Sequence, residues 1–171
     1  NLRGLFAGGN PLGSINTIDY ITFATIGNAA DFGDLSTSRG YAAGCSNNLR
    51  GVFGGGDPGP GVSNVIDYIQ LDTTGDAADF GDLSVGRTEI TSASNGHGGI
   101  EVGVFARPEL GGHPDRAAFA GGFNSGDPAE TNVIDYIQIM TTGNAADFGN
   151  LSVARGQTTG FSSSTRGITY A

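Results

Sequence analysis

The chain has 171 residues, of which 31 are glycine and 6 are proline, and only 15 % are charged. Glycine destabilises helix interiors, and no run approaches the ~18 apolar residues of a membrane span, so a helical bundle, a coiled coil and a transmembrane protein are all disfavoured. The net charge of −9, with arginine as the only basic residue type, disfavours nucleic acid and anionic membranes as partners, because both are bound through basic side chains.

Three copies of one repeat dominate the sequence. Each copy has a glycine pair, then Ile-Asp-Tyr, then Asp-Phe-Gly, then arginine. From the Ile of Ile-Asp-Tyr to the Asp of Asp-Phe-Gly the offset is 13 in every copy, and from that Asp to the arginine it is 8. Fixed offsets of this kind predict a repeat architecture. The recurring residues are Gly8, Gly9, Gly55, Gly56, Gly121 and Gly122, then Asp19, Asp67 and Asp135, then Phe32, Phe80 and Phe148, and finally Arg39, Arg87 and Arg155.

The second copy shows the predicted elements most clearly. Residues 50–56 predict a short strand that ends in glycines, and residues 65–71 predict a β-branched strand that is covered on both faces. Residues 75–82 read as a turn-rich connection with a buried phenylalanine, and residues 88–94 as a strand of small side chains. A repeated four-stranded unit of about 48 residues with both sheet faces buried is typical of a β-propeller blade.

The chain divides into repeats at about residues 1–47, 48–115 and 116–171 of a single segment, 1–171. The second repeat carries an insertion at residues 96–115, which contains an alternating, strand-like stretch followed by a loop. Loops on rigid scaffolds often carry binding functions, so this insertion is the candidate binding element. Its candidate binding residues are Glu101, Phe105, Arg107 and His113. An alternative is that the insertion only docks against a neighbouring subunit.

The recurring carboxylates have a structural and a functional interpretation. Asp31, Asp79 and Asp147 are expected to cap backbone N–H groups in turns. Calcium is the alternative, since Asp76 and Asp82 lie near Asp79, but asparagine replaces both in the third copy.

A second set of aspartates lies on the central strands. We expect Asp19, Asp67 and Asp135 to pair with the arginine of the same repeat and to join strands or blades. A catalytic carboxylate pair is the alternative, but such a pair is usually single and asymmetric.

The remaining candidate residues, two histidines and one cysteine, give little support for an enzymatic function. His97 and His113, the only histidines, both fall in the insertion, where their irregular spacing favours loop turns over a metal site. Cys45 aligns with Ala93 and Phe161, which predicts a small core side chain rather than a nucleophile, and one cysteine allows no internal disulfide. We therefore expect no enzymatic activity, no metal and no cofactor.

The repeat resembles the kelch family of β-propellers. The resemblance rests on the glycine-ended strand 53–56, the Ile-Asp-Tyr strand that ends at Tyr68, the aromatic segment around Phe80 and the arginine at 87. Phenylalanine stands where kelch repeats usually carry tryptophan, and the interval from tyrosine to phenylalanine is 12 residues, longer than is usual in kelch. The expected fold is thus an all-β, kelch-like propeller.

The resemblance also implies an order of strands in each blade. In the second unit, Tyr41 to Asn47 would be the inner strand, followed by residues 49–55 and 65–71, with residues 83–87 as the outer strand. The chain would then begin at a second strand (2–8) and end at another (166–171), with about three four-stranded blades visible in what we expect to be a larger propeller. Either the polypeptide continues beyond both ends, which we favour, or neighbouring chains complete the ring.

A second resemblance concerns the amino-acid sequence of one segment of the repeat. The phrase Thr-Thr-Gly-Asn-Ala-Ala-Asp-Phe-Gly-Asn-Leu is similar to tandem repeats in virion proteins of tailed marine and cyanobacterial phages. It implies a non-enzymatic structural protein of the virion or the extracellular space, in a tail, fibre or capsid-associated component. Its partners would be other virion or assembly proteins, with host attachment through a surface glycan or receptor as a further role. A lectin-like, carbohydrate-binding propeller is the alternative, and a propeller enzyme is a weaker one.

Overall fold

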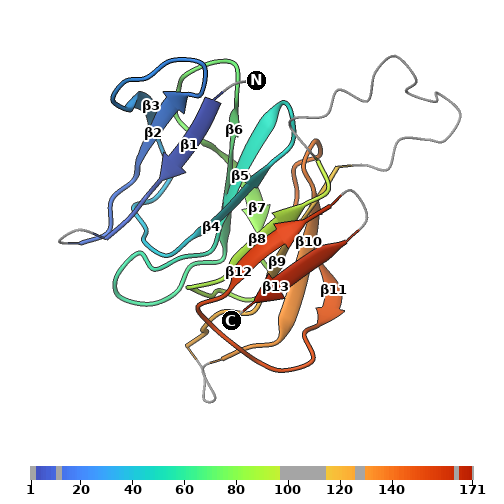
Figure 1. The fold of residues 1–171 in the computed structure, drawn as a ribbon. Coiled ribbons are helices and arrows are strands. Elements are labelled where there is room, and N and C mark those ends of the chain that lie inside the picture. Colours follow the sequence, from blue (N-terminus) through green and yellow to red (C-terminus); the bar gives the residue numbers. More distant parts are fainter. Residues whose placement is uncertain (1–2, 11–12, 97–114, 126–129, 164–165, 171) are drawn as a thin grey trace, which may run out of the picture.

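The computed structural model describes residues 3–10, 13–96, 115–125, 130–163 and 166–170, and this part of the chain contains β-strands and no helix (Figure 1). The strands are β1 (Arg3–Ala7), β2 (Thr17–Thr22), β3 (Ala30–Asp34), β4 (Ala43–Ser46), β5 (Arg50–Gly54), β6 (Val65–Gln70), β7 (Ala78–Asp82), β8 (Thr91–Ser94), β9 (Arg116–Ala120), β10 (Val133–Gln138), β11 (Ala146–Asn150), β12 (Thr159–Ser162) and β13 (Gly167–Tyr170). The expected all-β class is confirmed.

The strands form four antiparallel sheets that follow one another along the chain. β4–β7 and β8–β11 are four-stranded, and in each of them neighbours in sequence are neighbours in the sheet. The first sheet holds β1–β3 and the last holds only β12 and β13. The first strands of the last three sheets, β4, β8 and β12, lie side by side, so consecutive sheets are arranged about a common inner edge (Figure 1).

The inner edge is held by serine hydroxyls. Ser92 Oγ donates to the Gly44 carbonyl at 2.8 Å, and Ser94 Oγ donates to the Ser46 carbonyl at 2.6 Å. Ser162 Oγ repeats the contact one sheet further on, at 2.6 Å from the Ser94 carbonyl. The small side chains expected for the inner strands thus allow close approach and also supply hydrogen bonds from sheet to sheet.

One expected strand is wrong. The outer strand was placed at residues 83–87, but β7 occupies Ala78–Asp82, within the stretch that we expected to be a turn-rich connection. Residues 83–87 lie outside any strand, because this segment leaves its own sheet and turns toward the next one. A register irregularity between Ile66 and Asp67 lets the short β7 pair with β6. The other expected strands that lie in the described residues are present, and their described ends fall up to three residues short of the expected ones.

The hydrophobic core lies between the sheets in two clusters. The first two sheets enclose Ile18, Phe32, Leu35, Ile69 and Leu71. The two four-stranded sheets enclose a larger cluster, which includes Val52, Ile66, Phe80, Leu83, Ile90, Phe119, Ile137 and Ile139. Sheet faces that pack on both sides remove apolar surface from water, which explains why the third strands carry apolar residues on both faces.

Candidate functional site: the arginine–aspartate contacts between sheets

The recurring arginine is the centre of each contact between sheets. Arg39 follows β3 and reaches across to Asp67 on β6, with 2.8 Å between Nη2 and Oδ2, and both side chains are 0 % exposed. The Arg39 guanidinium also donates to the carbonyls of Val65, at 3.1 Å, and Phe53, at 3.3 Å. One side chain therefore binds two strands of the next sheet through charge-assisted hydrogen bonds.

The next pair of sheets repeats this geometry. Arg87 Nη2 lies 2.6 Å from Asp135 Oδ2, and both side chains are again 0 % exposed. Its other contacts are the Val133 carbonyl at 2.7 Å and the Phe119 carbonyl at 3.5 Å. Two independent occurrences show that the repeat encodes the contact.

A serine completes the environment of each buried carboxylate. Ser36 donates from its backbone N–H to Asp67 Oδ2 at 3.1 Å and from its hydroxyl to Oδ1 at 2.6 Å. Ser84 makes the same two bonds to Asp135, at 3.1 and 2.6 Å. The sequence analysis missed these serines. The signal was present, because a Leu-Ser pair precedes the arginine by the same interval in all three copies.

The arginine and aspartate pair across repeats, whereas we expected them to pair within one. Arg39 belongs to the first repeat and Asp67 to the second, and Arg87 and Asp135 span the second and third repeats in the same way. The physical reason is the path of the chain after the outer strand, which carries the arginine to the following sheet. Each pair therefore joins two neighbouring sheets, and its aspartate comes from the following repeat.

The buried pairs are unsuited to acid–base chemistry. Burial lowers the pKa of Arg39 and of Arg87, and the attraction of Asp67 and Asp135 opposes that shift. Each carboxylate has both oxygens occupied by serine and arginine donors and is closed to solvent. A substrate cannot reach such a group, so the arrangement holds sheets together and offers no proton or nucleophile.

The outer strands make a second contact between sheets, through backbone atoms. The N–H groups of Gly75 and Ala77 donate to the carbonyls of Phe32 and Asp34, both at 2.7 Å. Asp76 Oδ1 accepts from the Asp34 N–H at 3.0 Å. The same contact joins the next two sheets, where Asn144 Oδ1 accepts from the Asp82 N–H at 3.1 Å.

These contacts bear on the calcium alternative. An amide replaces the carboxylate of Asp76 in the third copy without loss of the contact, so the carboxylate acts as a hydrogen-bond acceptor. Asp31, Asp79 and Asp147 each accept from the N–H two residues later, at 3.0–3.2 Å, which is the turn geometry expected for them. Within the described ranges, no three His, Cys, Asp or Glu side chains are grouped to hold a metal ion.

The glycine pairs contact the arginine of their own repeat. The N–H of the second glycine donates to the arginine carbonyl in each copy, from Gly9 at 3.1 Å, from Gly56 at 2.9 Å and from Gly122 at 2.8 Å. The pair thus fixes the segment that leads to the next sheet, in addition to ending a strand.

A second recurring arginine escaped the sequence analysis. Arg3, Arg50 and Arg116 open the second strands and lie over the rings of Tyr20, Tyr68 and Tyr136, at 4.9, 4.5 and 5.1 Å from the ring centroids. Each tyrosine also meets the phenylalanine of its own outer strand edge to face, at 5.8–5.9 Å between centroids. The signal was an arginine three residues before the phenylalanine of each glycine-ended strand.

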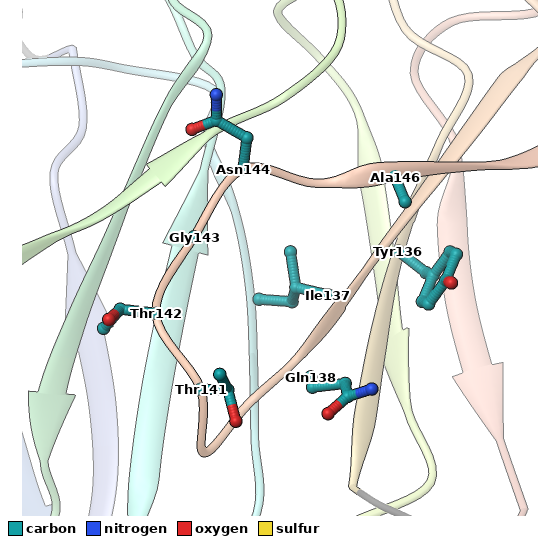
Figure 2. Close-up of a pocket in the computed structure, with 8 residues that line it drawn as sticks. All are labelled: Tyr136, Ile137, Gln138, Thr141, Thr142, Gly143, Asn144 and Ala146. Atoms are coloured by element: carbon teal, nitrogen blue, oxygen red, sulfur yellow. The ribbon is translucent and has the colours of Figure 1, made fainter.

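A surface hollow of about 270 Å³ lies where β10 turns into β11 (Figure 2). It is lined by Tyr136, Ile137, Gln138, Thr141, Thr142, Gly143, Asn144 and Ala146. These residues include no carboxylate, histidine or cysteine, and Figure 2 shows the Asn144 side chain pointing away from Gln138 and Thr141. The polar side chains that line the hollow carry hydroxyl and amide groups.

The thiol of Cys45 is shielded. Cys45 lies on β4, is half-buried and packs against the larger core cluster. Burial raises the pKa of the thiol to about 12, and a hydrogen bond with Ser92 opposes the shift. The group is protonated at neutral pH and is a poor nucleophile.

This shift predicts slow alkylation of Cys45. The pKa of about 12 lies about three units above the usual 9.0, so iodoacetamide at pH ~8.5 should react about 1000-fold more slowly with the folded chain than with the urea-unfolded chain. Mass spectrometry of quenched samples measures both rates. Similar rates would contradict the burial of the thiol.

The same shift predicts how folding stability depends on pH. The thiol of the unfolded chain ionises at lower pH than the thiol of the folded chain, so the contribution of Cys45 to folding stability is complete below pH 9 and is lost as the pH rises toward 12.

The candidate binding residues of the insertion, Glu101, Phe105, Arg107 and His113, lie outside the described residues, as does His97. What the structure describes is where the insertion leaves and rejoins the sheet. It follows β8 and precedes β9, which are paired neighbours, as expected for an insertion between the inner and second strands.

No protein-family model matches the chain, and no curated protein matches it. In the described part of the chain, no helix is long and apolar enough to cross a membrane.

Proposed function

We propose that the chain is part of a kelch-like β-propeller that serves as a non-enzymatic structural and interaction scaffold. The observation that carries the proposal is the use of the recurring side chains. Arginine, aspartate, serine and phenylalanine recur in every copy, and in both complete contacts they are buried between sheets or bound to the neighbouring sheet. Residues that a repeat uses in this way stabilise an array and are unavailable for catalysis.

Two features support a propeller. Consecutive four-stranded sheets pack face to face with their first strands adjacent, and the connection from each outer strand leads to the inner strand of the next sheet. Both sheet faces carry apolar side chains, as blades require. Propellers usually close with about four to eight blades, so the proposal includes a ring larger than the sheets described here.

The proposed setting is a phage virion, in a tail, fibre or capsid-associated component that contacts other virion proteins or the host surface. This part of the proposal rests on the resemblance of one repeat segment to tandem repeats in virion proteins of tailed phages.

The test is to look for the chain in particles. Antibodies raised against residues 1–171 would be used to probe purified phage particles by immunogold microscopy, and quantitative mass spectrometry would give the copy number. We expect labelling at a defined place on the particle and a fixed stoichiometry. Absence from particles, combined with saturable binding of the chain on a glycan array, would replace this proposal with the lectin-like alternative.

A further inference from the structure

The insertion leaves β8 and rejoins β9 through four described residues, which we call the insertion base: Asn95, Gly96, Asp115 and Arg116. The Asn95 N–H donates to the Arg116 carbonyl at 3.1 Å, and Asn95 Oδ1 accepts from the Arg116 N–H at 2.6 Å. The Asn95 side chain therefore closes the insertion base by taking the place of a backbone carbonyl.

Two other sheets use the same side-chain cap between their first and second strands. Asn47 Oδ1 accepts from the Arg50 N–H at 2.7 Å, and Ser163 Oγ accepts from the Arg166 N–H at 3.1 Å. Either an asparagine or a serine thus serves as the cap at this position of the repeat. Asn95 differs from every other asparagine of the chain in one respect, because it alone precedes a glycine.

Contact with the preceding sheet requires that glycine. A Cβ on Gly96 would lie 2.6 Å from Asn47 Cβ and 3.0 Å from Asn47 Cα. Gly96 is buried, and the Asn47 side chain that it touches is fixed by a 2.9 Å hydrogen bond from Nδ2 to Asp115 Oδ2. The cap and this contact together place an asparagine–glycine pair at the insertion base.

An asparagine–glycine pair can undergo an intramolecular reaction. The glycine backbone nitrogen gives its proton to water and attacks the asparagine Cγ, and glycine permits this approach because it has no Cβ. A C–N bond forms while negative charge develops on Oδ1. The side-chain amide then takes up a proton and leaves as ammonia, which produces a succinimide ring. Water opens the ring and gives aspartate or isoaspartate.

We propose that Asn95–Gly96 is a self-modification site, which converts to isoaspartate in the folded chain and thereby loosens the insertion base. Two features of the site favour the reaction. The Arg116 N–H donates to the oxygen on which the charge develops, and such a donor stabilises an oxyanion. The Gly96 N–H donates no hydrogen bond to another described residue, so the attack breaks none of the described bonds.

Isoaspartate would change the insertion base in two ways. Its main chain runs through Cβ and Cγ, so the backbone gains one carbon atom and the close fit of Gly96 against Asn47 is lost. Its carboxylate adds a negative charge near Asp115, whose Cγ would lie 3.3 Å from a Cβ on Gly96. Both changes weaken the hydrogen bonds that hold the candidate binding insertion to its sheet. The inference needs neither a closed ring nor a virion setting.

The test is to age the folded chain in solution. The wild type and Asn95→Ser would be held at mildly alkaline pH and physiological temperature, and peptide mapping by mass spectrometry would locate each converted asparagine. Isoaspartyl methyltransferase with a labelled methyl donor distinguishes isoaspartate from aspartate. We expect the wild type to convert Asn95 before any other asparagine. Asn95→Ser, which keeps the cap that Ser163 provides in the last sheet, should form no product at this position.

Hydrogen exchange then measures the state of the insertion base. Exchange at the Arg116 N–H should be faster in the aged wild type than in the fresh protein, and unchanged in aged Asn95→Ser. Freshly prepared Asn95→Asp adds the charge without lengthening the backbone, so it should show a smaller increase. Asn95 that stays intact while the urea-unfolded chain converts would overturn the inference, as would converted chains that keep the exchange rate of fresh ones. Neither result bears on the particle experiment.

Discussion

Arg87→Met is expected to lower the free energy of unfolding by about 3–5 kcal/mol, because it leaves Asp135 charged and buried without its partner. Asp135 is 0 % exposed and lies 2.6 Å from the guanidinium that is removed. The two hydrogen bonds from Ser84 would remain, but they cannot neutralise the charge. Urea unfolding, followed by circular dichroism and tyrosine fluorescence, measures the change.

The third repeat supplies the matched control. Arg155→Met removes the same side chain where no carboxylate faces it among the described residues, and it should change the unfolding free energy by less than about 1 kcal/mol. The double variant Arg87→Met/Asp135→Leu should recover most of the loss, since it also removes the buried carboxylate that the single variant leaves without a partner. Equal losses for Arg87→Met and Arg155→Met would mean that the buried pair does not hold the sheets together.

The contrast between these arginines shows what the sequence can predict. Fixed offsets identified the recurring residues, because three copies at constant spacing exceed what chance allows. They could not tell whether Arg87 pairs with Asp67 or with Asp135, since the linear order is the same in both cases. The packing of the next sheet decides it, and that packing is a property of the array rather than of one repeat.

The misplaced outer strand has a similar cause. Asp-Phe-Gly-Asp contains residues that local preference assigns to turns, and Leu83-Ser-Val has a better strand composition. Yet β7 forms from Ala78–Asp82 because its backbone is bound on both sides, by β6 in its own sheet and by Gly143 and Ala145 of the next unit. Leu83 instead enters the core, and the segment behind it turns to the neighbouring sheet. Tertiary hydrogen bonds outweighed propensity at this position.

The close approach of these backbones leads to the second large effect, at Gly81. Its φ is +142°, and a Cβ at this position would lie 2.5 Å from the carbonyl carbon and oxygen of Gly143 and 2.9 Å from the Asn144 nitrogen. Gly149 holds the equivalent place in β11, with φ +134° and the same turn bond from its aspartate, but a Cβ there would meet nothing within 4 Å. A comparison of substitutions at Gly81 and Gly149 therefore separates the effect of backbone conformation from the effect of contact between sheets.

Gly81→Ala is therefore expected to destabilise the chain by about 2–3 kcal/mol more than Gly149→Ala. Both substitutions place alanine in a strained conformation, and that shared cost cancels in the comparison. Only Gly81→Ala forces two sheets apart and weakens the bonds from Gly143 to Phe80 and from Ala145 to Asp82, each 2.7 Å long. Urea unfolding gives the difference, and hydrogen exchange should show faster loss of protection at Gly143 and Ala145. If the two alanine variants were equally stable, Gly81 would be needed only for its backbone conformation, and the contact between sheets would not require a glycine at this position.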